Sequence, residues 1–285
     1  MPGQKQQGVA LAIVVWFLAA MSLLVAGIVF QSKVDTRMAQ AHVAKAKAVA
    51  AGDGAIELML AALQSKQIKS FRGRGAPTLT FEVGEQSVEV LLIPTSGLID
   101  LNGAPRELLS KLFSSQGGVE KGDAQLLADN VIKWRSQAVP GTRQAAKFRS
   151  IEDLLKVEGI GRTLLEGIRD SVVVGVSSRG GVDWQSAPAA VLSVLSGNEA
   201  SRVSSIVEQR GGGMVPDKTL PRGLNPRFQT TGSGNDYRVD ALVTVGDKQW
   251  LRRRWVTMGS GGRGILPWRY TGTEAARAVA GNVGY

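Results

Sequence analysis

The sequence contains no cysteine and only one histidine, His42, among its 285 residues. These absences exclude a disulfide framework, a cysteine nucleophile and a zinc site built from cysteine and histidine. No serine lies in a nucleophile-elbow pattern, and no phosphate-binding loop is present. We therefore predict that the protein is not an enzyme, and we place His42 at a solvated helix position.

Charge is nearly absent from the first thirty residues, where Lys5 is the only charged side chain. Between Val9 and Phe30 the residues are apolar except for Ser22. A helix over this segment is roughly 33 Å long, which matches the roughly 30 Å hydrocarbon core of a bilayer. A cleaved secretory signal has a shorter apolar region. The pattern predicts a transmembrane helix over 9–30 that is retained as an anchor.

A short leader, MPGQKQQG, precedes the apolar segment and ends in Gly8. It resembles the leader of type IV pilins and type II secretion pseudopilins. The resemblance implies that a prepilin peptidase removes residues 1–8 by cleaving between Gly8 and Val9, and that Val9 is then methylated. Ile13 stands where pilins normally carry glutamate, and this departure is typical of the minor pseudopilin K branch. A lipid-facing isoleucine explains Ile13 equally well.

A periplasmic stalk helix is predicted over residues 31–69, directly after the anchor. Small and apolar residues recur there at alternating spacings of three and four, which is one face of a helix. The stripe consists of Val34, Met38, Ala41, Ala44, Ala48, Ala51, Ala55, Leu58 and Ala62. Gly52 and Gly54 each weaken a helix by about 1 kcal/mol relative to alanine, so a local bend is one possibility there.

Two stretches of alternating apolar and polar residues predict β-hairpins. The first covers residues 78–93 with a turn at Gly84 and Glu85, and the second begins at Tyr237 with a turn at Gly246 and Asp247. An isolated hairpin is marginally stable, so we expect both to join one antiparallel sheet packed on the stalk helix. We assign 77–97 and 213–270 to this head and 271–285 to a C-terminal tail.

The residues between the hairpins, 98–212, predict an inserted α-helical domain with an internal echo. IDLNGAPRELLSKLF is similar to VDWQSAPAAVLSVLS, and each copy leads to a second helix that ends in arginine. The matching positions are Asp100 and Asp183, Ala104-Pro105 and Ala187-Pro188, and Arg135 and Arg210. Proline suits the first turn of a helix because its φ is fixed and its missing N–H costs nothing there. We expect two related helical units.

A helix-hairpin-helix signature lies between the two copies, with its turn at Gly159, Ile160 and Gly161. Ser150 is the expected N-cap of the first helix, and Asp153 has the capping-box offset. Such turns commonly bind DNA phosphates, and residues 31–285 carry a net charge of +9, from 33 basic and 24 acidic side chains. A membrane-anchored DNA receptor for competence is therefore the alternative function. Acidic side chains follow the turn, so we favour close helix packing and expect no nucleic acid.

The order of these motifs resembles the minor pseudopilin K family of type II secretion systems, whose chains often end near a motif like Ile265-Leu266-Pro267-Trp268-Arg269. The resemblance implies an α+β fold with a long N-terminal helix on an antiparallel pilin-like sheet, carrying the helical insertion. It implies an inner-membrane protein with a periplasmic C-terminal head. The implied partners are minor pseudopilins I and J, the major pseudopilin and the prepilin peptidase. The implied role is to initiate and cap the pseudopilus, with the insertion above the sheet obstructing further subunits.

No cofactor is predicted with certainty, although the family resemblance allows calcium at the sheet edge. The candidate ligands are Glu82, Glu85, Asp236, Asp240 and Asp247. Their spacing matches no standard calcium loop, so we favour solvated surface charges. The cluster of Arg252, Arg253 and Arg254 is expected to form a polar sheet face, with an acidic partner as the alternative.

Overall fold

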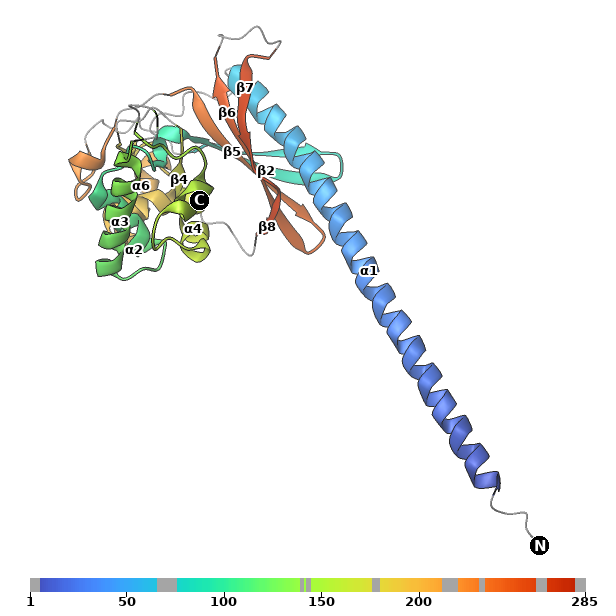
Figure 1. Cartoon of the computed structure of the whole chain (residues 1–285). Helices are drawn as coiled ribbons and strands as arrows, with labels where there is room; N and C mark the ends of the chain where they lie inside the picture. Colours follow the sequence, from blue (N-terminus) through green and yellow to red (C-terminus); the bar gives the residue numbers. More distant parts are fainter. Residues whose placement is uncertain are drawn as a thin grey trace.

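The computed structural model describes residues 6–65, 76–138, 141, 145–175, 180–211, 220–230, 234–259 and 266–279, with side chains from Ala10 onward in the first helix and through Arg210 in the last. Residues 1–5 of the predicted leader lie outside this range, as do Ile265 of the C-terminal motif and residues 280–285. The chain begins with one long helix, α1 (Gln6–Gln64). Its N-terminal part projects away from the rest of the molecule (Figure 1).

One antiparallel sheet contains both predicted hairpins, in the order β1-β2-β5-β6-β7, with β8 also paired to β6. The strands are β1 (Thr78–Val83), β2 (Gln86–Pro94), β5 (Asp236–Val245), β6 (Lys248–Met258), β7 (Trp268–Thr273) and β8 (Arg277–Val279). Val83 pairs with Gln86 and Val245 pairs with Lys248, so the two predicted turns are confirmed. Gly84 and Gly246 have φ of 61° and 65°, which glycine adopts without strain.

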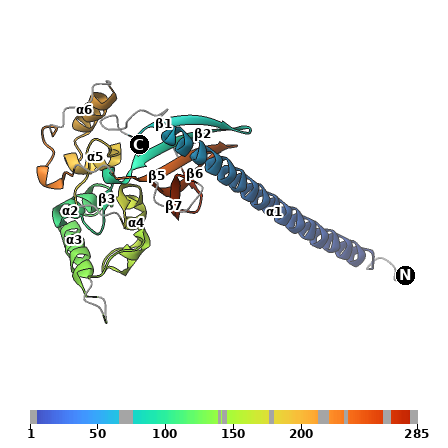
Figure 2. The same ribbon diagram turned by 90° about the horizontal axis from the view of Figure 1, so that it is seen from above.

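The C-terminal half of α1 covers one face of the sheet (Figures 1 and 2). The apolar positions of both hairpins meet it, as the alternation predicts. This core contains Ala48, Ala51, Ala55, Ile56, Met59 and Leu60 of α1 with Val88, Val90, Leu92, Val239, Ala241 and Val243 of the sheet. The α+β fold with a long N-terminal helix on an antiparallel, pilin-like sheet is therefore confirmed.

The predicted small-residue stripe matches the buried face only in its middle. Ala48, Ala51 and Ala55 are buried, but Leu58 is 47% exposed and Met59 takes its place in the core. The stripe repeats every 3.5 residues, whereas a straight helix turns every 3.6, so the stripe drifts about 20° per heptad around the helix. Leu58 lies one heptad after Ala51, so it is displaced about 20° to the margin of the buried face, and Ala62 beyond it is again partly buried.

Gly52 brings α1 close to the sheet, and the helix continues through it. A Cβ placed on Gly52 would lie 2.8 Å from Cβ of Arg252 and 3.4 Å from Cγ2 of Val243. Any larger side chain would push the helix away from β5 and β6. The helix runs unbroken from Gln6 to Gln64, so the glycines here serve close packing.

The inserted domain is mostly helical. Its elements are η1 (Thr95–Gly97), β3 (Ile99–Asp100), α2 (Arg106–Ser115), α3 (Lys121–Ser136), η2 (Ile151–Lys156), α4 (Arg162–Ile168), η3 (Arg169–Ser171), β4 (Val172–Val173), α5 (Ala189–Ser196), α6 (Ala200–Gly211) and η4 (Pro226–Phe228). The short strands β3 and β4 pair in parallel. Pro105 and Pro188 occupy the N-cap positions of α2 and α5, one residue before the first helical position that proline was expected to favour.

The domain limits differ from those predicted at two places. The core of the insertion includes Leu220, Leu224 and Phe228. An isolated parallel β-bridge also joins Val182 to Gln229. Residues 220–230 therefore belong to the insertion. Residues 271–279 complete β7 and form β8, so the sheet includes this part of the predicted tail. In both cases a later segment returns to cover apolar surface that a local sequence pattern does not reveal.

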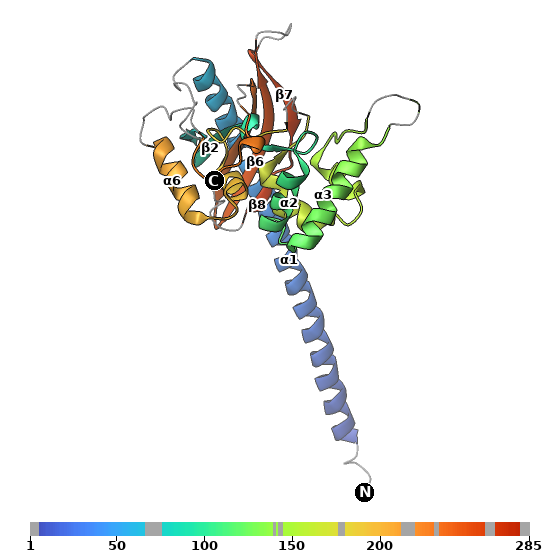
Figure 3. The ribbon, with the colours of Figure 1, turned by 90° about the vertical axis from the view of Figure 1, so that its left-hand side faces the viewer.

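The insertion lies beside the sheet, on the face opposite α1 (Figures 1 and 3). This differs from the expected position above the sheet. The sheet is therefore the middle layer between α1 and the helices of the insertion. Leu91, Ile93, Leu242 and Leu251 point from the sheet into the core of the insertion, so the two parts share one apolar cluster.

Candidate functional site

The first half of α1 is an exposed apolar rod. Every side chain from Ala10 to Val43 is exposed, including Trp16 at 78% and Leu23 at 76%. Among the described residues this helix alone is long and apolar enough to cross a membrane. A polypeptide surface of this size and polarity is stable in lipid or against other apolar helices. The exposed segment therefore meets the physical requirement for the predicted anchor at 9–30.

The predicted leader residues lie at the start of this rod. Gly8 and Val9 are within α1, and Ile13 is 62% exposed on it. Ile13 thus faces whatever surrounds the helix, as either interpretation of it requires. Cleavage between Gly8 and Val9 and methylation of Val9 stay predictions.

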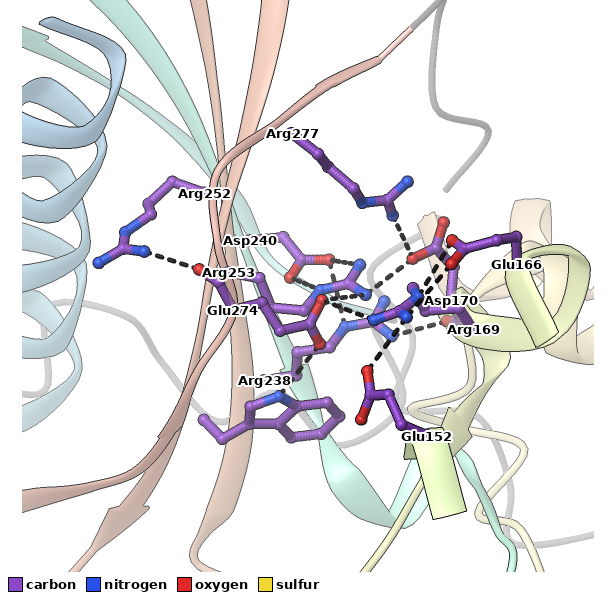
Figure 4. Close-up of polar contacts among 11 residues, drawn as sticks. Glu152, Glu166, Arg169, Asp170, Arg238, Asp240, Arg252, Arg253, Glu274 and Arg277 are labelled. Atoms are coloured by element: carbon purple, nitrogen blue, oxygen red, sulfur yellow. Dashed lines mark hydrogen bonds and ion pairs between the residues drawn. The ribbon is translucent and has the colours of Figure 1, made fainter. Parts of the chain in front are cut away.

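An ionic cluster joins the sheet to the insertion on the face opposite α1 (Figure 4). At its centre, Arg253 of β6 donates two hydrogen bonds to the Asp240 carboxylate of β5, at 2.7 and 2.8 Å. Arg238 lies 3.1 Å from the same carboxylate. All three side chains are at most 1% exposed. Two buried guanidinium groups thus face one buried carboxylate within the sheet.

Asp170 of the insertion supplies the second carboxylate. Its Oδ1 accepts hydrogen bonds from Arg253 and Arg277, both at 2.7 Å, and its main-chain oxygen accepts one from Arg238 at 2.6 Å. One residue therefore contacts β5, β6 and β8. Arg169 beside it is within 4 Å of three carboxylates, those of Glu152, Glu166 and Glu274. The insertion is thus fixed to the sheet by ion pairs in addition to apolar contact.

The protonation of this cluster follows from its charges. Burial alone would raise the pKa of Asp170, but the guanidinium groups of Arg253, Arg277 and Arg238 outweigh it and lower the pKa to about 2. Burial would also lower the pKa of Arg253, and the carboxylates of Asp240 and Asp170 instead hold it above its usual value. Asp170 and Arg253 are therefore both ionised at neutral pH and act as a fixed pair.

The predicted arginine cluster is divided between the two faces of the sheet. Arg253 points to the insertion, whereas Arg252 and Arg254 point to α1 and both pair with Asp53 at 2.7 Å. Successive strand residues point to opposite faces, so three consecutive arginines cannot form one polar face. The expected polar sheet face is therefore wrong. The alternative of an acidic partner is met within the chain, where Asp53 pairs with Arg252 and Arg254 and Asp240 pairs with Arg253.

The candidate calcium ligands do not converge. Asp240 is buried between Arg238 and Arg253, so its expected place among solvated surface charges is wrong. Asp236 accepts a hydrogen bond from the Thr257 hydroxyl, and Glu82 accepts one from Ser87. Within the described part of the chain, no group of three or more acidic or histidine side chains has metal-binding geometry. The signal that sequence reasoning missed is the pairing of Asp240 with Arg253 across β5 and β6.

The helix-hairpin-helix turn serves packing at one of its two glycines. Gly159 has φ of 84°, and a Cβ there would lie 2.7 Å from Cδ2 of Leu127 on α3. Ile160 is buried, and Gly161 caps α4 with open space around it. The segment before the turn is the 3-10 helix η2, with the predicted capping box at its start. The close contact with Leu127 and the positive φ therefore explain glycine at position 159 without a ligand.

The internal echo recurs at the level of contacts. Asp100 and Asp183 each accept a hydrogen bond from the backbone N–H two residues later, at 3.0 and 3.1 Å. Arg135, near the end of α3, donates to the Ala104 carbonyl at 2.8 Å. Arg210, near the end of α6, donates to the Ala187 carbonyl at 2.7 Å. In each copy an arginine side chain thus donates a hydrogen bond to the main-chain carbonyl of the alanine before the proline, as expected for two related helical units.

No protein-family model matches the chain, and no curated protein matches it. One similar solved structure is the crystal structure of the GspK-GspI-GspJ complex from the enterotoxigenic Escherichia coli type 2 secretion system. A chain of that complex is 13% identical to this one, with a TM-score of 0.44, and the match covers 88% of this chain and 98% of the other. The pilin-like assignment of the fold is based on the chain's own helix, hairpins and insertion.

Proposed function

We propose that the protein is a minor pseudopilin that initiates and caps the pseudopilus of a type II secretion system. The observation that carries this proposal is a single helix whose segment Ala10–Phe30 is exposed and, except for Ser22, apolar, and whose C-terminal half packs on a sheet. One element thereby links a membrane-compatible segment directly to a folded head. Movement of the head and extraction of the anchor from lipid are then coupled without a flexible linker.

Assembly in this proposal proceeds by helix packing and includes no catalytic step. The exposed segment Ala10–Phe30 leaves the bilayer and packs among equivalent helices of other subunits, which again bury its apolar side chains. The proposed partners are minor pseudopilins I and J and the major pseudopilin. Before assembly the protein is anchored once in the inner membrane, with the head in the periplasm.

In this proposal the insertion caps the pseudopilus, because its helices occupy the space beside the sheet. The helices lie on the face opposite α1, so they extend the head sideways by a full layer (Figure 2). A neighbouring subunit that approaches this face meets the insertion before it meets the sheet. Removal of the insertion is therefore expected to give longer or unregulated pseudopili.

The mature amino terminus gives the most direct test. The full chain is coexpressed with a prepilin peptidase, purified in detergent and analysed by intact mass spectrometry. We expect a chain that begins at methylated Val9, and a Gly8→Leu variant that keeps its leader. The matched control is Gly27→Leu, where a Cβ has nothing within 4 Å and processing is expected to be normal. A wild-type chain that retains Met1 contradicts the proposal.

The alternative of a DNA receptor has a separate test at the helix-hairpin-helix turn. The purified chain is titrated with duplex DNA at physiological salt, together with an Arg162→Gln variant. Binding weakened specifically by this substitution supports the receptor. We expect no retention of DNA, because Glu158 directly precedes the turn and Glu166 follows it in α4.

A further inference from the structure

A cleft of about 620 Å³ opens between the insertion and the sheet, next to the ionic cluster. Its volume is within the roughly 300–1,000 Å³ typical of ligand sites. One wall consists of Arg149–Glu152 and residues 173–175 of the insertion, and the other consists of the ends of β5, β6 and β7. The cleft is thus bounded by both parts of the head.

The charged groups of the cleft differ in whether they have ion-pair partners. Glu152 pairs with Arg169 at 3.1 Å, and Glu274 lies within 4 Å of Arg169 and Arg253. The two cationic residues, Arg149 and Arg269, form no ion pair within the described residues, and both are exposed. They stand on opposite walls, since Arg149 precedes η2 and Arg269 belongs to β7. Asp236 accepts a hydrogen bond from Thr257 but has no ion pair among the described residues. The side chains of the lining without an ion pair are therefore two arginines and one carboxylate, and their net charge is positive.

The lining of the cleft suits an extended polypeptide. Among the described strands β7 is terminal in the sheet, and its residues 271–273 line the cleft next to Glu274. An unpaired strand edge offers backbone N–H and C=O groups to an incoming chain. The hydroxyl groups of Ser150, Thr257 and Thr271 add further hydrogen-bonding capacity.

The walls are also held in place before any ligand arrives. Trp255 Nε1 lies 3.4 Å from Glu274 Oε1, and the Glu274 main-chain oxygen accepts a hydrogen bond from Arg252 at 2.7 Å. Arg169 connects Glu274 to Glu152 across the cleft base (Figure 4). A site that is already ordered loses little conformational entropy on binding.

We propose that this cleft binds an extended acidic segment of a partner protein, with its carboxylates at Arg149 and Arg269. The inference concerns a partner surface of the head and is independent of leader cleavage and of the filament role. The commitment to an acidic segment follows from the two arginines, which have no ion pair among the described residues, whereas Glu152 and Glu274 already pair with Arg169. Asp236 is the one carboxylate of the lining without a cationic partner there.

The test uses the full-length protein in detergent and two labelled octapeptides. The first alternates glutamate and threonine, and the second replaces each glutamate with glutamine. Fluorescence anisotropy is expected to show binding of the first peptide and at least tenfold weaker binding of the second. No binding of the glutamate peptide at millimolar concentration, or equal binding of the two peptides, overturns the proposal.

Variants locate the binding site. Arg149→Gln and Arg269→Gln are each expected to weaken binding roughly threefold, and the double variant roughly tenfold, as for exposed ion pairs. The matched control is Arg162→Gln, an exposed arginine outside the cleft, which is expected to leave binding unchanged. Hydrogen exchange in residues 268–273 should slow when the peptide binds. Equal losses in the control and cleft variants, or unaltered exchange in β7, overturn the assignment to this cleft.

Discussion

The two faces of the sheet are covered in different ways. On the α1 face, alanine and glycine allow the helix to approach closely, and Gly52 lies directly over Arg252. On the insertion face, Arg238, Asp240 and Arg253 are buried as an ion cluster that Asp170 completes. The first face is stabilised by close apolar packing, with the pairs of Arg252 and Arg254 with Asp53 at its partly exposed margin. The second combines apolar contact with fixed charges, which define one orientation of the insertion.

The largest expected effect is on the insertion face. Asp240→Asn leaves Arg238 and Arg253 buried without their shared carboxylate. Breaking a buried ion pair typically costs about 3–5 kcal/mol, so the free energy of unfolding should fall by this order. Urea unfolding of the full chain in detergent measures it, with Asp129→Asn at an exposed ion pair as the control.

A compensated variant sharpens the same comparison. Replacing Asp240 by Leu together with Arg238 and Arg253 by Met removes the three charges that are buried within the sheet and leaves Asp170 paired with Arg277. It should recover much of the stability lost in Asp240→Asn, because apolar replacements of buried ion pairs are often neutral. If the triple variant is as unstable as the single one, the cluster contributes more than charge compensation.

On the α1 face the corresponding change is Gly52→Val. Its Cβ would lie 2.8 Å from Cβ of Arg252, a distance that requires the helix or the strand to move. Overpacking of this kind costs about 1–3 kcal/mol. Ala50→Val, on the exposed side of the same helix, measures the cost of valine without contact to the sheet, about 0.5 kcal/mol relative to alanine. Gly52→Val has no such propensity cost, because glycine is the poorer helix former, so its loss reports the contact with the sheet. Equal losses in the two variants would show that contact with the sheet is not close at Gly52.

Sequence reasoning recovered the α1 face better than the insertion face. The alternation in β5 shows which residues point to α1, because Val239, Ala241 and Val243 are apolar. The same alternation makes Arg238 and Asp240 look solvent-facing. Their burial depends on a second layer that is supplied by residues 95–230, and no periodicity in β5 contains that information. The hairpin turns were predictable because the positive φ that Gly84 and Gly246 adopt depends only on the residues of the turn.

The helical insertion shows the same limit. Its internal echo was detectable because both copies repeat the same local cap, from Asp100 and from Asp183. Its position beside the sheet was not, since that depends on Asp170 meeting Arg253 and Arg277 across long stretches of sequence. The cleft between Arg149 and Arg269 has the same origin, because two elements that form one cavity are separated by over a hundred residues.

Acid should weaken the insertion face through Asp170. The pKa of Asp170 is about 2 in the folded chain and about 3.9 when unfolded, so the unfolded state binds more protons between these values. The stability from Asp170 is therefore complete above about pH 4 and is lost as the pH falls from about 4 to about 2. About a third of the side chain is exposed, so solvent screening keeps this loss below that of Asp240→Asn. Unfolding measured at pH 6 and pH 3 should show a smaller difference for Asp170→Asn than for the wild type.

The smallest expected effect is at Leu58, where the predicted stripe departs from the buried face of α1. Leu58 is 47% exposed, whereas Met59 beside it is fully buried. Leu58→Gln should change the free energy of unfolding by no more than about 0.5 kcal/mol, as is usual for surface substitutions. Met59→Ala should cost about 2–5 kcal/mol through loss of buried volume. If the two costs were reversed, the stripe with its 3.5-residue repeat would be the true contact face.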